Sequence, residues 1–179
     1  MKQKVLKIKG LESHSKYNAF IDYSFNKCTA FMLVYINYNG KGYSKEKKEF
    51  RKKLKSFEIK RRRNPSWPGV PYTFSNKTEY CIVFYRTTPE AKQILKEKTS
   101  LFDWSSPSSP EDLAFFVGDM CWFYSVGHES LAFCIHPDVN DNCFFANNEL
   151  IDYSNYYDYY YDQFNEKGLE TGNNNPDMK

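Results

Sequence analysis

Apolar and polar residues alternate along this chain with periods that predict both helices and strands. The apolar positions of residues 17–28 (YNAFIDYSFNKC) recur at helical spacing, which predicts a helix there. Residues 30–38 (AFMLVYINY) and 79–86 (EYCIVFYR) are unbroken runs of strand-forming residues and predict two buried strands. The first of these runs ends at Asn39-Gly40, a turn signal.

A second helix is predicted in a strongly basic segment, residues 45–63. Phe50, Leu54 and Phe57 fall at positions i, i+4 and i+7, so they share one helix face. Ser44 precedes the segment where an N-cap is expected. The pattern therefore predicts an amphipathic helix with an apolar stripe facing the core and a lysine-rich outer face. The helix is expected to end at the proline-containing stretch 64–69 (NPSWPG).

The second half of the chain begins with a clear helix start. Thr88-Pro89-Glu90 combines an N-cap, a proline in the first turn and an acid near the helix dipole, so a helix is expected to run toward Lys98. After a Ser/Pro-rich loop, Ser109-Pro110-Glu111-Asp112 is predicted to cap one short helical turn.

Three strand-like segments follow, at residues 115–117, 121–126 and 131–135. The segments 121–126 and 131–135 are apolar at both alternating sets of positions, which is typical of central strands covered on both faces. The turn between these two strands is Gly127-His128-Glu129. The whole pattern predicts an α+β fold, with a single antiparallel or mixed sheet and helices packed on it.

Length and composition fit this fold. The 179 residues are enough for one domain with a sizeable core, and we expect that domain to span residues 1–151. Aromatic residues make up 18 % of the chain, so the core is expected to be aromatic-rich. Residues 152–179 have the composition of a tyrosine-rich, acidic tail that is partly disordered.

Several features indicate a cytoplasmic protein. There is no apolar run long enough for a transmembrane segment and no recognisable secretory signal. The five cysteines are an odd number and contain no CxxC pair, which favours free buried thiols over a disulfide framework.

Charge is unevenly distributed. Residues 41–63 hold 12 Lys/Arg against three Glu, whereas residues 152–179 hold six Asp/Glu against two Lys. The basic segment fits either phosphate contacts, with nucleic acid or anionic lipid, or a solvated helix face. Arg61, Arg62 and Arg63, which lie beyond the apolar stripe, are the leading binding candidates, together with Lys52 and Lys53.

Motifs for common chemistry are missing from the sequence. It has no GxGxxG, no P-loop, no HExxH and no GxSxG, and we expect no cofactor. His128 and Glu129 are weak candidates for catalysis, because only a turn would let their side chains converge. Cys134 and His136, two residues apart, are weak candidates for a metal site completed by Cys121 or Cys143.

Several short stretches together resemble a known family. They are Trp67-Pro68-Gly69, Thr88-Pro89-Glu90, Asp103-Trp104, residues 109–116 (SPEDLAFF), Cys121-Trp122-Phe123 and residues 125–129 (SVGHE). This block, covering roughly residues 17–135, resembles an uncharacterised family of small bacterial cytoplasmic proteins that share the pattern DW…PEDLxFF…WFxSVxHE. No activity is established for that family, so the resemblance implies a bacterial cytoplasmic protein and no particular chemistry.

Three functions stay open from the sequence. The first is a non-enzymatic protein-interaction module, resembling an immunity protein or a regulator, whose partner is another protein. The second is nucleic-acid binding through the basic segment 45–63. The third is an unrecognised enzyme that uses His128 and Glu129.

Overall fold

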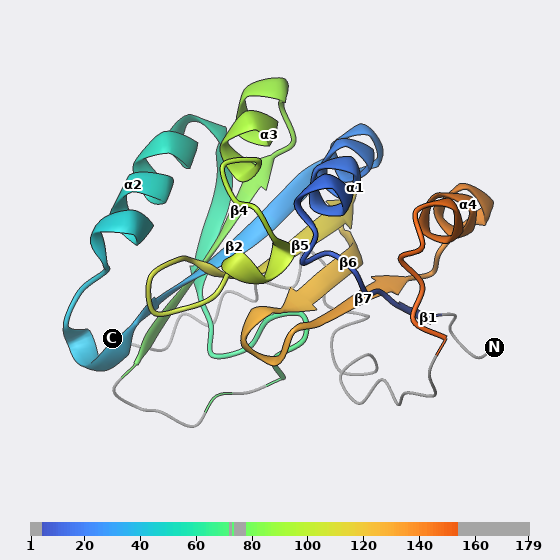
Figure 1. Ribbon diagram of the computed structural model, residues 1–179. Coiled ribbons are helices and arrows are strands. Elements are labelled where there is room, and N and C mark those ends of the chain that lie inside the picture. The colour runs from blue at the N-terminus through green and yellow to red at the C-terminus, as the bar shows by residue number, and fades with distance from the viewer. Residues whose placement is uncertain (1–4, 72, 74–77, 154–179) are drawn as a thin grey trace.

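The computed structural model describes residues 5–71, 73 and 78–153, and these residues form one seven-stranded antiparallel sheet with four α-helices (Figure 1). The strands are β1 (Val5–Lys7), β2 (Ala30–Asn37), β3 (Glu58–Arg63), β4 (Glu79–Arg86), β5 (Glu111–Val117), β6 (Met120–Val126) and β7 (Leu131–Ile135). The helices are α1 (His14–Lys27), α2 (Lys45–Leu54), α3 (Pro89–Leu95) and α4 (Val139–Asn147). The predicted α+β class, with one sheet and helices packed on it, is confirmed.

The strand order is β1-β7-β6-β5-β2-β4-β3, and every neighbouring pair is antiparallel. β1 and β3 are therefore the two edges of the sheet. β6 lies between β5 and β7, as its apolar residues on both faces predict.

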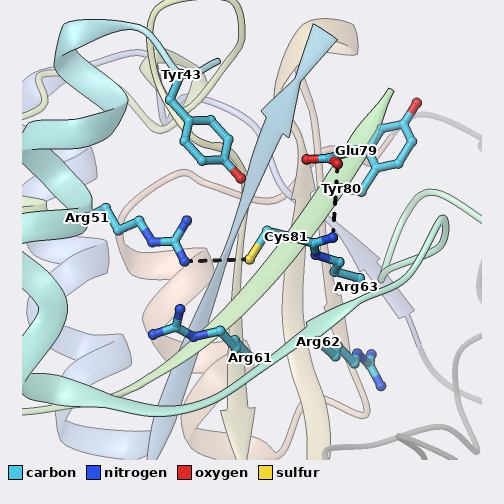
Figure 2. A pocket seen from close by; sticks show the side chains of 8 residues that line it. All are labelled: Tyr43, Arg51, Arg61, Arg62, Arg63, Glu79, Tyr80 and Cys81. Carbon is cyan, nitrogen blue, oxygen red and sulfur yellow. Dashed lines mark hydrogen bonds and ion pairs between the residues drawn. The ribbon is translucent and has the colours of Figure 1, made fainter. Parts of the chain in front are cut away.

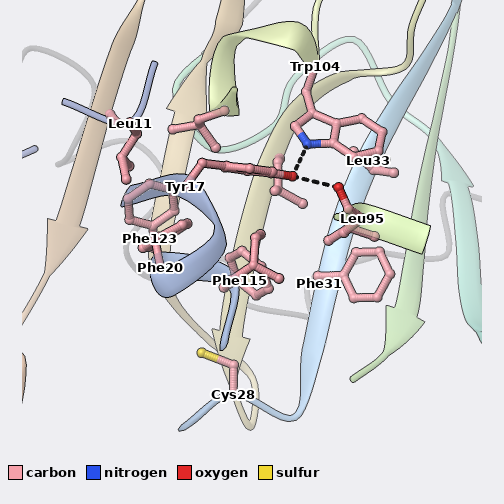
Figure 3. Packing of buried hydrophobic residues seen from close by; sticks show 14 of the residues in the cluster. Leu11, Tyr17, Phe20, Cys28, Phe31, Leu33, Leu95, Trp104, Phe115 and Phe123 are labelled. Carbon is pink, nitrogen blue, oxygen red and sulfur yellow. Dashed lines mark hydrogen bonds between the residues drawn. The ribbon is translucent and has the colours of Figure 1, made fainter. Parts of the chain in front are cut away.

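The sheet carries an apolar cluster on each face. The helix-side cluster joins residues of all four helices to β2, β4, β5 and β6, and it is rich in aromatic rings. In Figure 3 Tyr17 reaches across this cluster, donating to the carbonyl of Leu95 at 2.9 Å and accepting from Trp104 Nε1 at 2.9 Å. The second cluster lies on the opposite face and includes Trp67, together with strand residues such as Tyr124 and Val126.

Short polar motifs fix where the helices begin. Ser44 Oγ accepts from the Lys47 amide at 3.2 Å at the start of α2, and Thr88 Oγ1 accepts from Ala91 at 3.2 Å at the start of α3. Both N-caps are those that the sequence predicts.

The predicted basic helix is wrong in its second half. α2 ends at Leu54, a 3₁₀ turn covers Lys55–Phe57, and residues 58–63 form the edge strand β3. Phe50 and Leu54 are buried as expected. Beyond Leu54, the sequence EIKRRR has only a weak helical pattern, with few apolar residues to pack a helix on the core. Its backbone instead forms hydrogen bonds with β4, so strand pairing overrides the local helical propensity.

The predicted helical turn at residues 109–112 is also wrong, because Glu111 and Asp112 begin β5. Asp112 takes a left-handed backbone conformation with φ 57°, and its amide donates to the carbonyl of Trp104 at 3.3 Å. The segment lies in the sheet because β5 pairs with β2 on one side and β6 on the other.

Two elements were not predicted. β1 is only three residues long, and α4 has a weak apolar pattern, although Asp138 and Asp141 form a capping box at its start. The predicted tail, residues 152–179, lies outside the described residues apart from its first two positions. None of the described helices is long and apolar enough to cross a membrane.

Candidate functional sites

The first candidate site is a basic surface formed by α2 and β3, which lie next to each other at one edge of the sheet (Figure 1). Its exposed basic residues are Lys41, Lys45, Lys48, Lys52, Lys53, Lys55, Arg61 and Arg63. Lys53 pairs with Glu97 at 2.5 Å, whereas Lys52 makes no ion pair with the described residues. Much of this positive charge is therefore available to a partner.

Arginines from both elements meet at a hollow of about 280 Å³ within this surface. We call it the arginine hollow; it is lined by Tyr43, Arg51, Arg61, Arg62, Arg63, Glu79, Tyr80 and Cys81 (Figure 2). Arg51, from α2, lies over the rings of Tyr35 and Tyr43, at 5.6 and 5.7 Å from their centroids. These rings hold the Arg51 guanidinium at the wall of the hollow.

The three arginines of β3 have different surroundings because a strand alternates its side chains. Arg61 and Arg63 stand opposite Val83 and Cys81 on the helix side, while Arg62 lies over the Phe84 ring on the other side. Arg61 pairs with Glu58, and that hydrogen bond raises the pKa of Arg61. Arg63 forms a looser ion pair, with 4.0 Å between its Nη1 and Glu79 Oε1.

Arg62 is half-buried, and burial lowers its pKa. Its Nε is buried without a hydrogen-bond partner. An orphaned donor of this kind is uncommon, because buried polar groups are normally paired. Arg61 and Arg63 thus present two exposed guanidinium groups on the helix side of β3, while the unsatisfied donor of Arg62 lies on the other side of the sheet.

The second candidate site surrounds the turn between β6 and β7. Gly127–Glu129 form a 3₁₀ turn, and His128 Nε2 lies 3.7 Å from Glu129 Oε1. The turn therefore brings the predicted pair together, with both side chains about half exposed. No nucleophile stands out beside them among the described residues, so their use in catalysis stays a hypothesis.

A cavity of about 470 Å³ opens beside His128. The residues that line it include Tyr38, Trp67, Tyr80 and Glu111. Glu111 is 5 % exposed and its neighbour Asp112 is fully buried, although carboxylates are rarely buried without a partner. Glu111, Asp112 and His128 each offer a ligand atom, and these atoms lie within 4.8 Å of one another.

Fixed donors hold both carboxylates. Glu111 Oε1 accepts from the Ser106 amide at 3.0 Å. Asp112 Oδ1 accepts from the Gly127 amide and Oδ2 from Trp67 Nε1, both at 2.7 Å. Burial, followed by the neighbouring Glu111, raises the pKa of Asp112 to about 7, while the two hydrogen bonds oppose that rise.

A buried lysine lies near this cluster without pairing with it. Lys47 Nζ donates to the carbonyl of Ile36 at 3.0 Å and to Ser106 Oγ at 2.9 Å, and burial lowers its pKa. Neither Glu111 nor Asp112 forms an ion pair with a described residue.

The structure separates the environments of the predicted thiol–imidazole pair, Cys134 and His136. Cys134 is buried on the helix side of the sheet, and burial raises the pKa of its thiol. His136 lies past the end of β7, exposed and with φ 49°, which breaks the strand alternation. In the described ranges, neither residue joins Cys121 or Cys143 in a group of three metal-capable side chains.

Sequence reasoning missed Arg51, Glu111 and Asp112 as site residues. Arg51 was visible only as one of many basic residues. Glu111 and Asp112 carried no signal of a site, because their approach to His128 depends on the pairing of β5 with β6.

Comparisons of this chain with models of protein families, with curated proteins and with solved structures gave no match.

Proposed function

We propose that this protein binds nucleic acid through the basic surface of α2 and β3. The observation that carries the proposal is the arginine hollow, where guanidinium groups of a helix and an edge strand meet beside the ring of Tyr43. Guanidinium groups bind phosphate in a bidentate manner, and tyrosine rings can stack on unpaired bases.

The charge pattern supports the same function. A surface of one sign attracts a polyanion over a distance, and each phosphate contact releases bound counterions. The exposed lysines of α2 extend the positive surface beyond the hollow, so a bound strand would meet further cations along its backbone.

Binding is tested by fluorescence anisotropy with a labelled single-stranded oligonucleotide and its duplex, between about 50 and 200 mM salt. Affinity should fall linearly with salt on a double-logarithmic plot. The Arg61→Ala/Arg63→Ala variant should bind more weakly and lower that slope by about 1.5, since each lost phosphate contact contributes about 0.7–0.9. Arg62 is left unchanged because its side chain packs on Phe84.

The matched control removes two positive charges near the opposite edge of the sheet. Lys9 follows β1, and Lys16 lies close to Gly10, so Lys9→Ala/Lys16→Ala changes net charge equally without touching α2 or β3. Equal losses of binding in the two double variants would contradict a site at the arginine hollow. Equally tight binding of poly-glutamate would contradict a preference for nucleic acid.

The second candidate function is the interaction with another protein, and the exposed edge of β3 favours it. β3 pairs only with β4 among the described strands, so its outer edge is open to an added strand. Its lysine and arginines would repel a second copy and favour an acidic segment. Resemblance to a family of small bacterial proteins supports a bacterial, cytoplasmic setting for either function. Tight binding of an acidic peptide in place of oligonucleotides would favour this alternative.

A further inference from the structure

The cavity beside the β6–β7 turn contains a ligand set that the nucleic-acid proposal does not use. Its members come from two strand ends: Glu111 and Asp112 from the start of β5, and His128 from the turn after β6. Neighbouring residues of a strand normally point to opposite faces. The left-handed backbone of Asp112 interrupts that alternation, and both carboxylates come within 4.8 Å of the His128 ring nitrogen.

The two carboxylates are buried, and neither forms an ion pair with a described residue, although the charges of Lys47 and Glu111 attract each other at longer range. Taking a carboxylate out of water is unfavourable unless a positive charge or several donors replace the water. Lys47, the nearest buried cation, donates instead to a carbonyl and a serine hydroxyl. Among the residues that the structure describes, none donates a hydrogen bond to Glu111 Oε2, although the side chain is 5 % exposed and lines the cavity.

The other three carboxylate oxygens are each held by one hydrogen-bond donor. Backbone or indole N–H groups bind Glu111 Oε1 and both oxygens of Asp112, and each oxygen keeps a second lone pair. Donors that fix the ligands in this way are typical of the surroundings of protein metal sites.

We propose that Glu111, Asp112 and His128 bind a divalent transition-metal ion, Zn²⁺ or a similar ion, at the wall of the cavity. A mixed set of two carboxylates and one imidazole suits Zn²⁺ better than Ca²⁺, which takes six to eight oxygen ligands. Ligand atoms of a tetrahedral zinc site lie about 3.5 Å apart. Rotation of the exposed His128 side chain would bring its ring nitrogen closer to the carboxylates, and a bound ion would stay open to the cavity that His128 and Glu111 line.

The test uses the full chain after removal of metals with EDTA. Zn²⁺ is titrated by calorimetry, and Co²⁺ is added as a spectroscopic probe. We expect one equivalent of either ion to bind, and the Co²⁺ spectrum to show d–d bands without a thiolate charge-transfer band. His128→Ala should weaken Zn²⁺ binding at least 10-fold, and Glu111→Gln should do the same.

The controls exclude binding elsewhere and loss of folding. His136→Ala and Cys143→Ser remove an exposed imidazole and an exposed thiol outside the cluster, and they should leave Zn²⁺ affinity unchanged. His128 is about half exposed, so His128→Ala should keep the circular dichroism spectrum of the wild type. The proposal is overturned by undetectable binding, by unchanged affinity in His128→Ala, by a thiolate band, or by Mg²⁺ or Ca²⁺ binding as tightly as Zn²⁺.

Discussion

Each of the three tryptophans donates its indole N–H to a buried acceptor, and these acceptors differ in charge. Trp67 donates to Asp112 at 2.7 Å and Trp122 to Asp141 at 3.0 Å, whereas Trp104 donates to the neutral hydroxyl of Tyr17 at 2.9 Å. Replacing each tryptophan by phenylalanine removes the donor and shrinks the ring in the same way. Differences in stability among the three variants therefore report how much each acceptor depends on the indole donor.

The largest loss of stability is expected for Trp67→Phe. A hydrogen bond to a charged group contributes about 1.5–3 kcal/mol and one between neutral groups about 0.5–1.5 kcal/mol. After Trp67→Phe the carboxylate of Asp112 keeps only the Gly127 amide, while Trp104→Phe leaves a neutral hydroxyl still bonded to Leu95. Trp67→Phe should thus lower the free energy of unfolding by about 1–2 kcal/mol more than Trp104→Phe.

The loss of unfolding free energy in Trp122→Phe should lie between those of Trp67→Phe and Trp104→Phe. The carboxylate of Asp141 is also charged and buried, but it keeps the Tyr23 hydroxyl at 2.8 Å, the Asp138 amide at 2.9 Å and Lys27 at 3.1 Å. Loss of one donor among four leaves that carboxylate well satisfied.

The assay is equilibrium unfolding in urea at pH 8.5 with EDTA present, where Asp112 is ionised in the folded protein because its pKa is about 7. The folded-state pKa lies above the ordinary value of 3.8, so this group favours folding below about pH 4, and that contribution is lost as pH rises through 7. At pH 5.5, where Asp112 is protonated in the folded protein, the loss of unfolding free energy in Trp67→Phe should therefore be close to the loss in Trp104→Phe. Equal losses for Trp67→Phe and Trp104→Phe at pH 8.5 would refute the reasoning.

Three further changes test local contacts. Gly127→Ala should lower the melting temperature by roughly 6–12 °C in a thermal melt. A Cβ at this position would lie 2.3 Å from the carbonyl oxygen of Trp104, and such an overlap costs about 3 kcal/mol. An unchanged melting temperature would contradict this contact. Asp138→Asn keeps the cap of α4 but loses the hydrogen bond from Lys27 that holds the pKa of Asp138 below 3.8. In urea unfolding at pH 7 the variant should be slightly less stable than the wild type, and this difference in stability should vanish as pH falls below 3.8. A stability difference that does not change with pH would exclude a role of the Asp138 charge. Ser44→Ala should lower the free energy of unfolding by about 1 kcal/mol through loss of the α2 cap, which a shift of the urea midpoint would measure and an unchanged midpoint would contradict.

The sequence was sufficient for elements whose determinants are local. Thr88-Pro89-Glu90 starts α3, and the apolar runs at 30–37 and 79–86 are strands, because caps and periodicity act within a few residues. The alternating apolar faces of 121–126 also place that strand in the interior of the sheet.

Tertiary structure alone decided the rest. Residues 58–63 form a strand because β4 offers them a pairing edge, which no local pattern of EIKRRR indicates. In the same way, Glu111 and Asp112 approach His128 because β5 pairs with β6 and the Asp112 backbone turns left-handed. Both candidate sites are built from residues distant in the chain. The sequence therefore indicated some of their members, such as Arg61, Arg63 and His128, whereas Arg51, Glu111 and Asp112 became candidates only through their positions in the fold.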